Sequence, residues 1–200
     1  MLITIIDNYD SFVFNLVRYL EETENNEIIV MKNDAVDWEI LDKSDGILLS
    51  PGPGLPNEAG NLMQVISRYH DTKNILGVCL GHQALAEFYG LKLKQTETLF
   101  HGKSSQAFLT IYHPFFKSIP KEFSVGRYHS WTVSEVNSCI ETLAQTDENE
   151  IMAIAHKKDK IIGVQFHPES ILTPSGRQMI NNWVQLIKKY STPEPKKDKD

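Results

Sequence analysis

The chain has few cysteines, no basic leader and no long hydrophobic run, and each shortage excludes a class of protein. Its 200 residues contain only Cys79 and Cys139, too few for a disulfide framework, which favours a reducing cytoplasm. The N-terminus lacks a basic segment and reaches an acidic residue at Asp7, so we expect a strand there and no signal peptide. No apolar run approaches about 18 residues, so no membrane-spanning helix is expected.

Positive charge is also in short supply. Lys and Arg number 20 against 26 Asp and Glu, which gives a formal net charge of −6. The basic stripe typical of nucleic-acid binding is absent, so no nucleic-acid partner is expected. A chain of this length with 41% hydrophobic residues suits one domain with a sizeable core. We place that domain at 1–190 and expect the charged, proline-bearing tail at 191–200 to be disordered.

The first half of the chain alternates apolar runs with amphipathic segments, and this alternation predicts an α/β fold. Such a pattern favours an open, mostly parallel twisted sheet with helices on both faces. Ser11 is placed to cap the first helix. The expected strands are 2–6, 27–31, 46–49 and 75–78, and the expected helices are 11–22, 37–43, 60–71 and 82–89.

The segment at about 91–140 has a different character, with β-type runs between turns. It predicts antiparallel strands, either added to one edge of the sheet or forming a small second sheet. Further strands are expected at 140–145, 151–156 and 161–166. Thr173 and Pro174 then open a last helix, with the threonine as cap and the proline in the first turn. We interpret its apolar stripe as core packing.

Cys79 is the most informative residue of the sequence. It follows a short apolar run, precedes good helix formers, and has glycine two positions before and two after it. This pattern is typical of a nucleophile elbow, a tight strand-to-helix turn that a Cβ would obstruct. The helix N-terminus favours a thiolate and offers N–H groups to an oxyanion. The alternative, a small buried hydrophobe, fits Cys139, which has no such frame.

A possible base for that thiol lies near the end of the chain. His167 follows the apolar stretch 161–166, and Glu169 lies two residues further on. A nucleophilic cysteine needs an imidazole within hydrogen-bond reach and a third group that orients it. Taken alone, the pattern favours a loop histidine that happens to neighbour a glutamate. A metal site is poorly supported, because a single His-x-Glu lacks a second ligand cluster.

A third segment, Ser50–Gly54, alternates proline and glycine directly after an expected strand. Such a loop can direct successive N–H groups at an anion, although the segment alone favours an ordinary Pro/Gly turn. Asp7–Asp10, this loop and Cys79 all follow expected strands. The carboxyl ends of parallel strands are where such sheets bind ligands.

Together these segments resemble the class I, triad-type glutamine amidotransferases, and within them the small subunits of anthranilate synthase and aminodeoxychorismate (para-aminobenzoate) synthase. The resemblance covers about residues 2–188, with the motifs in order and at family-like spacing. The shared segments are Asp7–Phe12, Ser50–Gly54, Gly77–Gln83, His101–Lys103, Gly126–Ser130 and Gly163–Thr173.

This resemblance implies a flavodoxin-like fold and a residue-by-residue division of roles. Cys79 attacks the side-chain amide of glutamine, His167 acts first as base and then as acid, and Glu169 orients His167. No cofactor or metal is implied. The partner implied is a chorismate-binding synthase large subunit, component I, which receives the ammonia. The implied glutamine-binding and oxyanion-binding residues are Gly52, Pro53, Gly54, Leu80, Gln83, Ser130 and Trp131.

Two other functions remain open at the level of the sequence. One is a free-standing cysteine hydrolase of γ-glutamyl or small peptide substrates, and the other is a non-catalytic relative that only binds a partner. Trp131 stands where the family usually has a smaller aliphatic residue, and Leu55 stands where threonine is common. These departures leave the triad positions intact but weaken any choice of partner. The sequence also leaves open whether the product is anthranilate or 4-amino-4-deoxychorismate.

Overall fold

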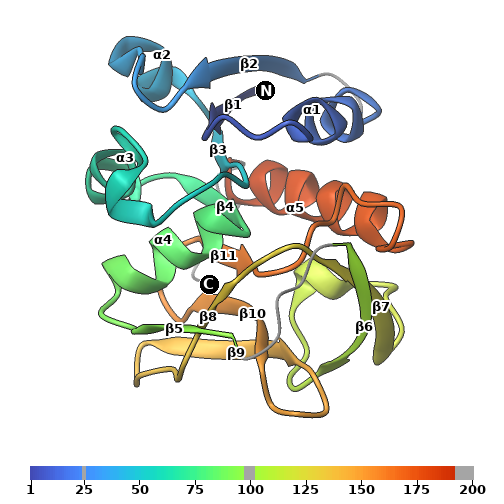
Figure 1. The fold of residues 1–200 in the computed structure, drawn as a ribbon. Coiled ribbons are helices and arrows are strands. Elements are labelled where there is room, and N and C mark those ends of the chain that lie inside the picture. The colour runs from blue at the N-terminus through green and yellow to red at the C-terminus, as the bar shows by residue number, and fades with distance from the viewer. Residues whose placement is uncertain (24–25, 97–101, 192–200) are drawn as a thin grey trace, which may run out of the picture.

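The computed structural model describes residues 1–23, 26–96 and 102–191, and Figure 1 shows its ribbon. Strands and helices alternate through the first half of the chain, as the sequence predicts. The strands are β1 (Leu2–Asp7), β2 (Glu27–Lys32), β3 (Gly46–Leu49), β4 (Asn74–Val78), β5 (Leu93–Gln95), β6 (Lys103–Leu109), β7 (Glu122–Arg127), β8 (Trp131–Val133), β9 (Ile140–Gln145), β10 (Ile151–His156) and β11 (Ile161–Val164). The helices are α1 (Val13–Glu21), α2 (Trp38–Lys43), α3 (Leu62–Tyr69), α4 (Leu80–Phe88) and α5 (Gly176–Ser191), with 3-10 turns η1 (Pro56–Glu58) and η2 (Pro114–Phe116).

One nine-stranded sheet organises the molecule, in the order β2-β1-β3-β4-β11-β10-β9-β6-β7. The strands from β2 to β11 are parallel, whereas each neighbouring pair from β11 to β7 is antiparallel. A second sheet pairs β5 with β8 and packs against α4. Both expected uses of the middle segment therefore occur, as an extended edge and as a small separate sheet.

Helices cover both faces of the parallel half, as Figure 1 shows. On one face, Leu16 of α1 and Trp183 of α5 belong to the larger apolar core. On the other face, Leu41 of α2, Val65 of α3 and Ala84 of α4 form a second core. The strands between them are buried on both sides, which explains why they read as continuous apolar runs in the sequence.

Helices α1, α3 and α5 each begin about two residues later than the sequence predicts. Residue 12, not Ser11, is the N-cap of α1, and its side chain makes no capping hydrogen bond. The Asp10 carboxylate accepts from the Phe12 N–H instead, so an Asx-type turn occupies the start of the helix. The last helix starts at Gly176, and the Thr173 hydroxyl oxygen accepts from the Gly126 N–H instead of capping the helix. The tail predicted at 191–200 lies, from residue 192 onward, outside the described residues.

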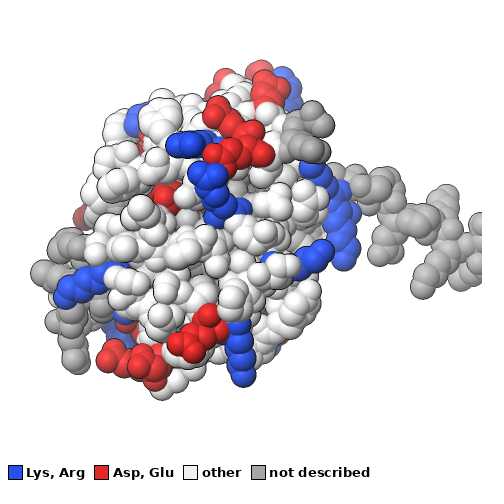
Figure 2. All heavy atoms as spheres, turned by 90° about the vertical axis from the view of Figure 1, so that its right-hand side faces the viewer, with Lys and Arg blue, Asp and Glu red and all other residues white. Residues whose placement is uncertain are grey.

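The surface carries mixed charge. Figure 2 shows the face to the right of Figure 1, where positive and negative side chains lie in small separate groups around a broad uncharged middle. No continuous basic surface runs over the described part of this face. Among residues 1–23, 26–96 and 102–191, no helix combines the length and apolarity needed to cross a membrane.

The apolar face of α5, which includes Trp183, should contribute to the stability of the fold. Trp183 is 1% exposed inside the larger core, so Trp183→Ala should lower the free energy of unfolding by about 3–5 kcal/mol. Ile171→Ala is the matched control, because that side chain is 93% exposed and its loss should change stability by less than about 0.5 kcal/mol. Equilibrium urea unfolding measures both. Similar losses for the two variants would contradict the core role of the stripe.

Candidate active site

Cys79 occupies a strained turn between β4 and α4. Its φ of 50° and ψ of −100° are unusual for a residue with a Cβ, and it serves as N-cap of the helix. The Cys79 N–H donates to the Val164 carbonyl at 2.8 Å, which ties the turn to the end of β11. The side chain is 7% exposed, so the thiol is sheltered but reachable.

The glycines around Cys79 are required by close packing rather than by positive φ. A Cβ on Gly77 would lie 2.5 Å from the Gly81 carbonyl carbon, and a Cβ on Gly81 would lie 2.3 Å from the Leu49 carbonyl oxygen. Both distances are far below ordinary contact, so α4 can sit this close to β3 and β4 only without these side chains. The elbow predicted from the sequence is thus held by direct backbone contact.

His167 and Glu169 lie beside the elbow, in the loop after β11. The Nδ1 of His167 and the Oε1 of Glu169 are 2.6 Å apart in a buried contact. This carboxylate fixes the tautomer and orientation of the imidazole, which leaves the other ring nitrogen, Nε2, for a different partner. Nε2 is buried and has no oxygen or nitrogen partner among the described residues. The structure therefore brings the three residues of the predicted triad together.

The electrostatic environment of His167 includes Cys79 as well as Glu169. Burial by itself pulls down the pKa of His167, but the charge of Cys79 and hydrogen bonds with Cys79 and Glu169 outweigh burial. The pKa of His167 is consequently raised well above its usual value. This arrangement favours a protonated imidazole beside the Cys79 sulfur, the pairing that a cysteine nucleophile needs.

The Pro-Gly loop is held against the elbow by Asn8, from the end of β1. The Asn8 N–H donates to the Ser50 hydroxyl at 2.9 Å, and its side-chain amide donates to the Ser50 carbonyl at 2.8 Å. Asn33 in turn donates to Asn8 Oδ1 at 3.0 Å. A Cβ on Gly52 would lie 2.5 Å from the Asn8 carbonyl oxygen, so the loop fits only with glycine there. Asn8 thereby orients the backbone N–H groups of this loop.

A cavity of about 260 Å³ opens beside the thiol. Its walls come from the Pro-Gly loop, the elbow, α4 and the segment before β8, and they include all but one of the predicted substrate-binding residues. Leu80 is the exception, since its side chain is buried in the second core while its backbone begins α4 next to Cys79. The lining residues are Gly52, Pro53, Gly54, Leu55, Cys79, Gln83, Tyr128, His129, Ser130 and Trp131.

Three polar residues that were not among the predicted catalytic or substrate-binding residues lie in or around this cavity. Asn8 clamps the loop, as described above. Gln165 is fully buried, and its amide lies 3.8 Å from the Cys79 sulfur. His129 is buried, and its Nδ1 lies 2.9 Å from the Trp131 carbonyl oxygen. The sequence feature that could have indicated these three residues is their position, since each lies within a few residues of the end of a predicted or actual strand.

Metal ligation finds no support in the described ranges, where no three His, Cys, Asp or Glu side chains gather as a metal site. His82, which adjoins the elbow, is fully buried, and burial lowers its pKa to about 4. A neutral ring packed against Gly163 has a structural role. His101, part of a predicted shared segment, lies outside the described residues.

Comparison with known proteins agrees with this geometry. The family model described as Glutamine amidotransferase class-I matches residues 4–186. The "Anthranilate synthase component 2" of Lactococcus lactis is 42% identical over 190 residues, which cover 93% of this chain and 95% of the relative. The "Aminodeoxychorismate/anthranilate synthase component 2" of Bacillus subtilis is 40% identical over 195 residues, covering 94% and 98%. The chain therefore belongs to the class I glutamine amidotransferase family.

A solved structure shows the same fold at lower sequence identity. A Thermoplasma acidophilum protein described as part of a GMP synthase superposes with a TM-score of 0.85, over 95% of both chains. At 24% identity, this likeness concerns the fold alone.

The contact between His167 and Glu169 predicts a pH effect. Replacing Glu169 with Gln removes a carboxylate that raises the pKa of His167, so the imidazole should titrate at lower pH in Glu169→Gln. NMR titration of the His167 ring measures this shift. Glu148→Gln, an exposed change, is the control. An unchanged His167 titration in Glu169→Gln would contradict the assigned electrostatics.

The raised pKa of His167 also determines how its contribution to folding stability changes with pH. Because folding favours the protonated ring, this contribution is fully present below the unfolded pKa of about 6.5 and is lost as pH rises through the folded pKa. As pH rises from about 6.5 through the folded pKa of His167, the free energy of unfolding should therefore fall less in Glu169→Gln than in the wild type.

Proposed function

We propose that this chain is the glutaminase subunit of a chorismate-using synthase. It hydrolyses glutamine to glutamate and passes ammonia to a large subunit that makes anthranilate or 4-amino-4-deoxychorismate. The observation that carries the proposal is the buried series Glu169–His167–Cys79, which ends at a cavity lined by the Pro-Gly loop. Family membership supports the reaction, and the printed names of the relatives support the choice of synthase.

The proposed chemistry uses one imidazole twice. The Cys79 thiolate attacks the side-chain amide carbon of glutamine, and the protonated His167 gives its proton to the amide nitrogen, which leaves as ammonia. Water, deprotonated by His167, then attacks the thioester and releases glutamate while the proton returns to the thiol. Glu169 keeps the ring aligned through both steps, and the protonated state favoured by the geometry suits the first of them.

The oxyanion of each tetrahedral intermediate needs donors that are already in place. The backbone of Gly52 and Gly54 and the N–H of Leu80 are the proposed donors, because the loop and the first turn of α4 flank the thiol. Removing one such donor typically lowers turnover by about 10²–10³. Gln83 and the Ser130–Trp131 backbone lie across the cavity, where they would hold the amino-acid end of glutamine.

A partner subunit is proposed because ammonia released into water would be protonated and lost to the synthase. A second hollow of about 390 Å³ lies on the other side of the triad, lined by His167 and Glu169. Its rim carries Phe12 and Ile171, which are 49% and 93% exposed. Apolar side chains this exposed beside a catalytic histidine suit coverage by another protein. The rim supports a partner on this side without choosing between the two products.

A variant of the proposed nucleophile should affect glutamine-dependent synthesis but not synthesis from ammonium. In the synthase complex, Cys79→Ser should lower glutamine-dependent synthesis by at least about 10³, since serine lacks an activated thiolate. Synthesis from added ammonium should remain within about twofold of wild type, because the large subunit uses it directly. Product formation from chorismate with each nitrogen source measures this split.

Cys139→Ser is the matched control and should leave both reactions unchanged. Loss of the ammonium reaction in Cys79→Ser would contradict the division of labour between subunits. A free-standing hydrolase would instead show strong activity on γ-glutamyl peptides with no large subunit present.

The exposed rim gives a separate test of the partner. Ile171→Asp places a charge in the proposed contact, so the large subunit should bind this variant about tenfold more weakly, or worse. Ile111→Asp is the control, because Ile111 is 40% exposed and lines neither cavity. Titration calorimetry gives both affinities. Equal binding by wild type and Ile171→Asp would place the interface elsewhere.

A further inference from the structure

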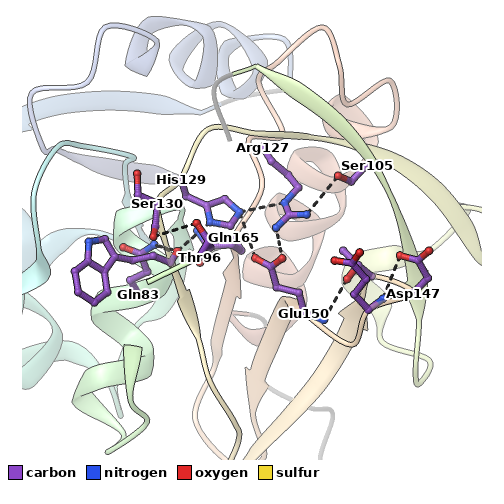
Figure 3. A network of polar contacts seen from close by, with 12 residues as sticks. Gln83, Thr96, Ser105, Arg127, His129, Ser130, Asp147, Glu150 and Gln165 are labelled. Carbon is purple, nitrogen blue, oxygen red and sulfur yellow. Dashed lines mark hydrogen bonds and ion pairs between the residues drawn. The ribbon is translucent and has the colours of Figure 1, made fainter. Parts of the chain in front are cut away.

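A buried polar network runs from the antiparallel part of the sheet to the proposed glutamine cavity, as Figure 3 shows. At its far end, Arg127 at the end of β7 pairs with Glu150 just before β10. The two side chains are only 3% and 14% exposed, so the charges are largely removed from water. Such a buried ion pair is costly unless its remaining donors and acceptors are used.

Arg127 uses one of those donors on His129. Its Nε–H donates to His129 Nε2 at 3.3 Å, so that ring nitrogen must be an acceptor without a proton. Burial and the charge of Arg127 lower the pKa of His129 to about 3, so the ring is neutral near pH 7. The one ring proton of a neutral histidine must then lie on Nδ1. Arg127 therefore fixes the tautomer of His129.

The Nδ1–H of His129 donates to the Trp131 carbonyl at 2.9 Å. The same carbonyl also accepts from the Gln83 side-chain amide at 2.8 Å, so both of its acceptor positions are used. The neighbouring Ser130 carbonyl accepts two hydrogen bonds from Thr96, one from its N–H at 2.9 Å and one from the Thr96 hydroxyl at 3.2 Å. Two donors on each carbonyl fix the peptide planes of this cavity wall.

The network also reaches the thiol. Gln83 Nε2 lies 3.3 Å from Gln165 Oε1, and the Gln165 amide donates toward the Cys79 sulfur at 3.8 Å. Figure 3 shows Gln83 and Gln165 beside His129, on the side of it away from Ser105. Displacement of the Trp131 carbonyl would therefore be transmitted to the side chains that border both substrate and nucleophile.

We propose that His129, oriented by the buried Arg127–Glu150 pair, is a positioning residue that sets the glutamine-binding geometry of the Ser130–Trp131 backbone. The inference rests on the proposed glutaminase function and adds residues that act through the cavity wall. His129 itself takes part in no bond-making step. Its loss should therefore weaken glutamine binding while the reactivity of the thiol is kept.

The test compares His129→Leu with His129→Gln in the full chain bound to its large subunit. Leucine can neither donate to the Trp131 carbonyl nor accept from Arg127, so the KM for L-glutamine should rise about tenfold. In His129→Gln the side-chain amide offers both a donor and an acceptor. The KM for the substrate L-glutamine should therefore return to within about threefold of wild type. In both variants kcat and the rate of Cys79 alkylation by iodoacetamide should stay within about twofold.

Arg127→Lys provides a second test that keeps the buried positive charge beside Glu150 but lacks the Nε–H donor. This variant should raise the KM for L-glutamine about threefold. If thermal unfolding shows that His129→Leu does not fold, the KM of Arg127→Lys tests the positioning role in its place. Arg68→Met is the matched control, because it removes an ion pair whose side chains are 48% and 50% exposed. That variant should leave KM unchanged.

The outcomes separate the two proposals. An unchanged KM in His129→Leu, or in Arg127→Lys when the leucine variant does not fold, overturns the positioning role. So does a failure of His129→Gln to recover binding. A fall in alkylation rate equal to the loss of kcat/KM also overturns it, because general distortion of the site would explain both. A wild-type complex that hydrolyses no glutamine overturns the proposed function, and the inference with it.

Discussion

The close approach of α4 to the parallel strands is the constraint on which the rest of the site depends. Gly81 lies against the backbone of β3, and Gly77 lies against the first turn of the helix. His82, one residue further along α4, packs against Gly163 of β11, where a Cβ would lie 2.6 Å from its Nδ1. Three glycine contacts thus join the elbow to both neighbouring strands. Because β11 leads directly into the His167 loop, the same packing that bends the chain at Cys79 also brings the imidazole to the sulfur.

Around this rigid centre, backbone groups are held by buried side chains that do no chemistry themselves. Asn8 fixes the Pro-Gly loop, and His129 fixes the opposite wall of the cavity. Thr173 ties the His167 loop to β7, because its hydroxyl donates to the His167 carbonyl and accepts from the Gly126 N–H. The ties made by Asn8 and Thr173 join segments more than forty residues apart in the sequence. Pre-positioned donors of this kind are what a reaction through an oxyanion requires, since they need not reorganise as charge develops.

The sequence predicted the regular elements well because their signals are local. Runs such as those of β3 and β4 are apolar throughout, and the structure confirms them to within a residue or two. The predicted helix starts at Ser11 and Thr173 were wrong for a common reason. Asp10 accepts from the Phe12 N–H in a turn just before α1, and Thr173 accepts from the Gly126 N–H, 47 residues away in the sequence. Local pattern shows which residues can cap a helix, but not which competing partner the fold supplies.

The same distinction applies to the candidate site. The glycine frame predicted the elbow, and strand order explains how residues 79 and 167 meet, because β4 and β11 are neighbours in the sheet. Gln165 and the Arg127–Glu150 pair carry no comparable local signal. Their placement depends on the antiparallel half of the sheet, whose registers follow from long-range pairing. Polar residues in such strands look ordinary until the partner strand is known.

The pairing of β4 with β11 also has a consequence for the order in which the chain acquires reactivity. Cys79 is synthesised early, but the strand that anchors its turn, and the imidazole beside it, are encoded more than eighty residues later. A nascent polypeptide leaving the ribosome therefore lacks both the anchor of the Cys79 turn and the imidazole beside it until β11 and the loop after it have emerged. The buried arrangement of Glu169, His167 and Cys79 can form only when the central sheet is complete, so a product truncated before β11 cannot assemble it.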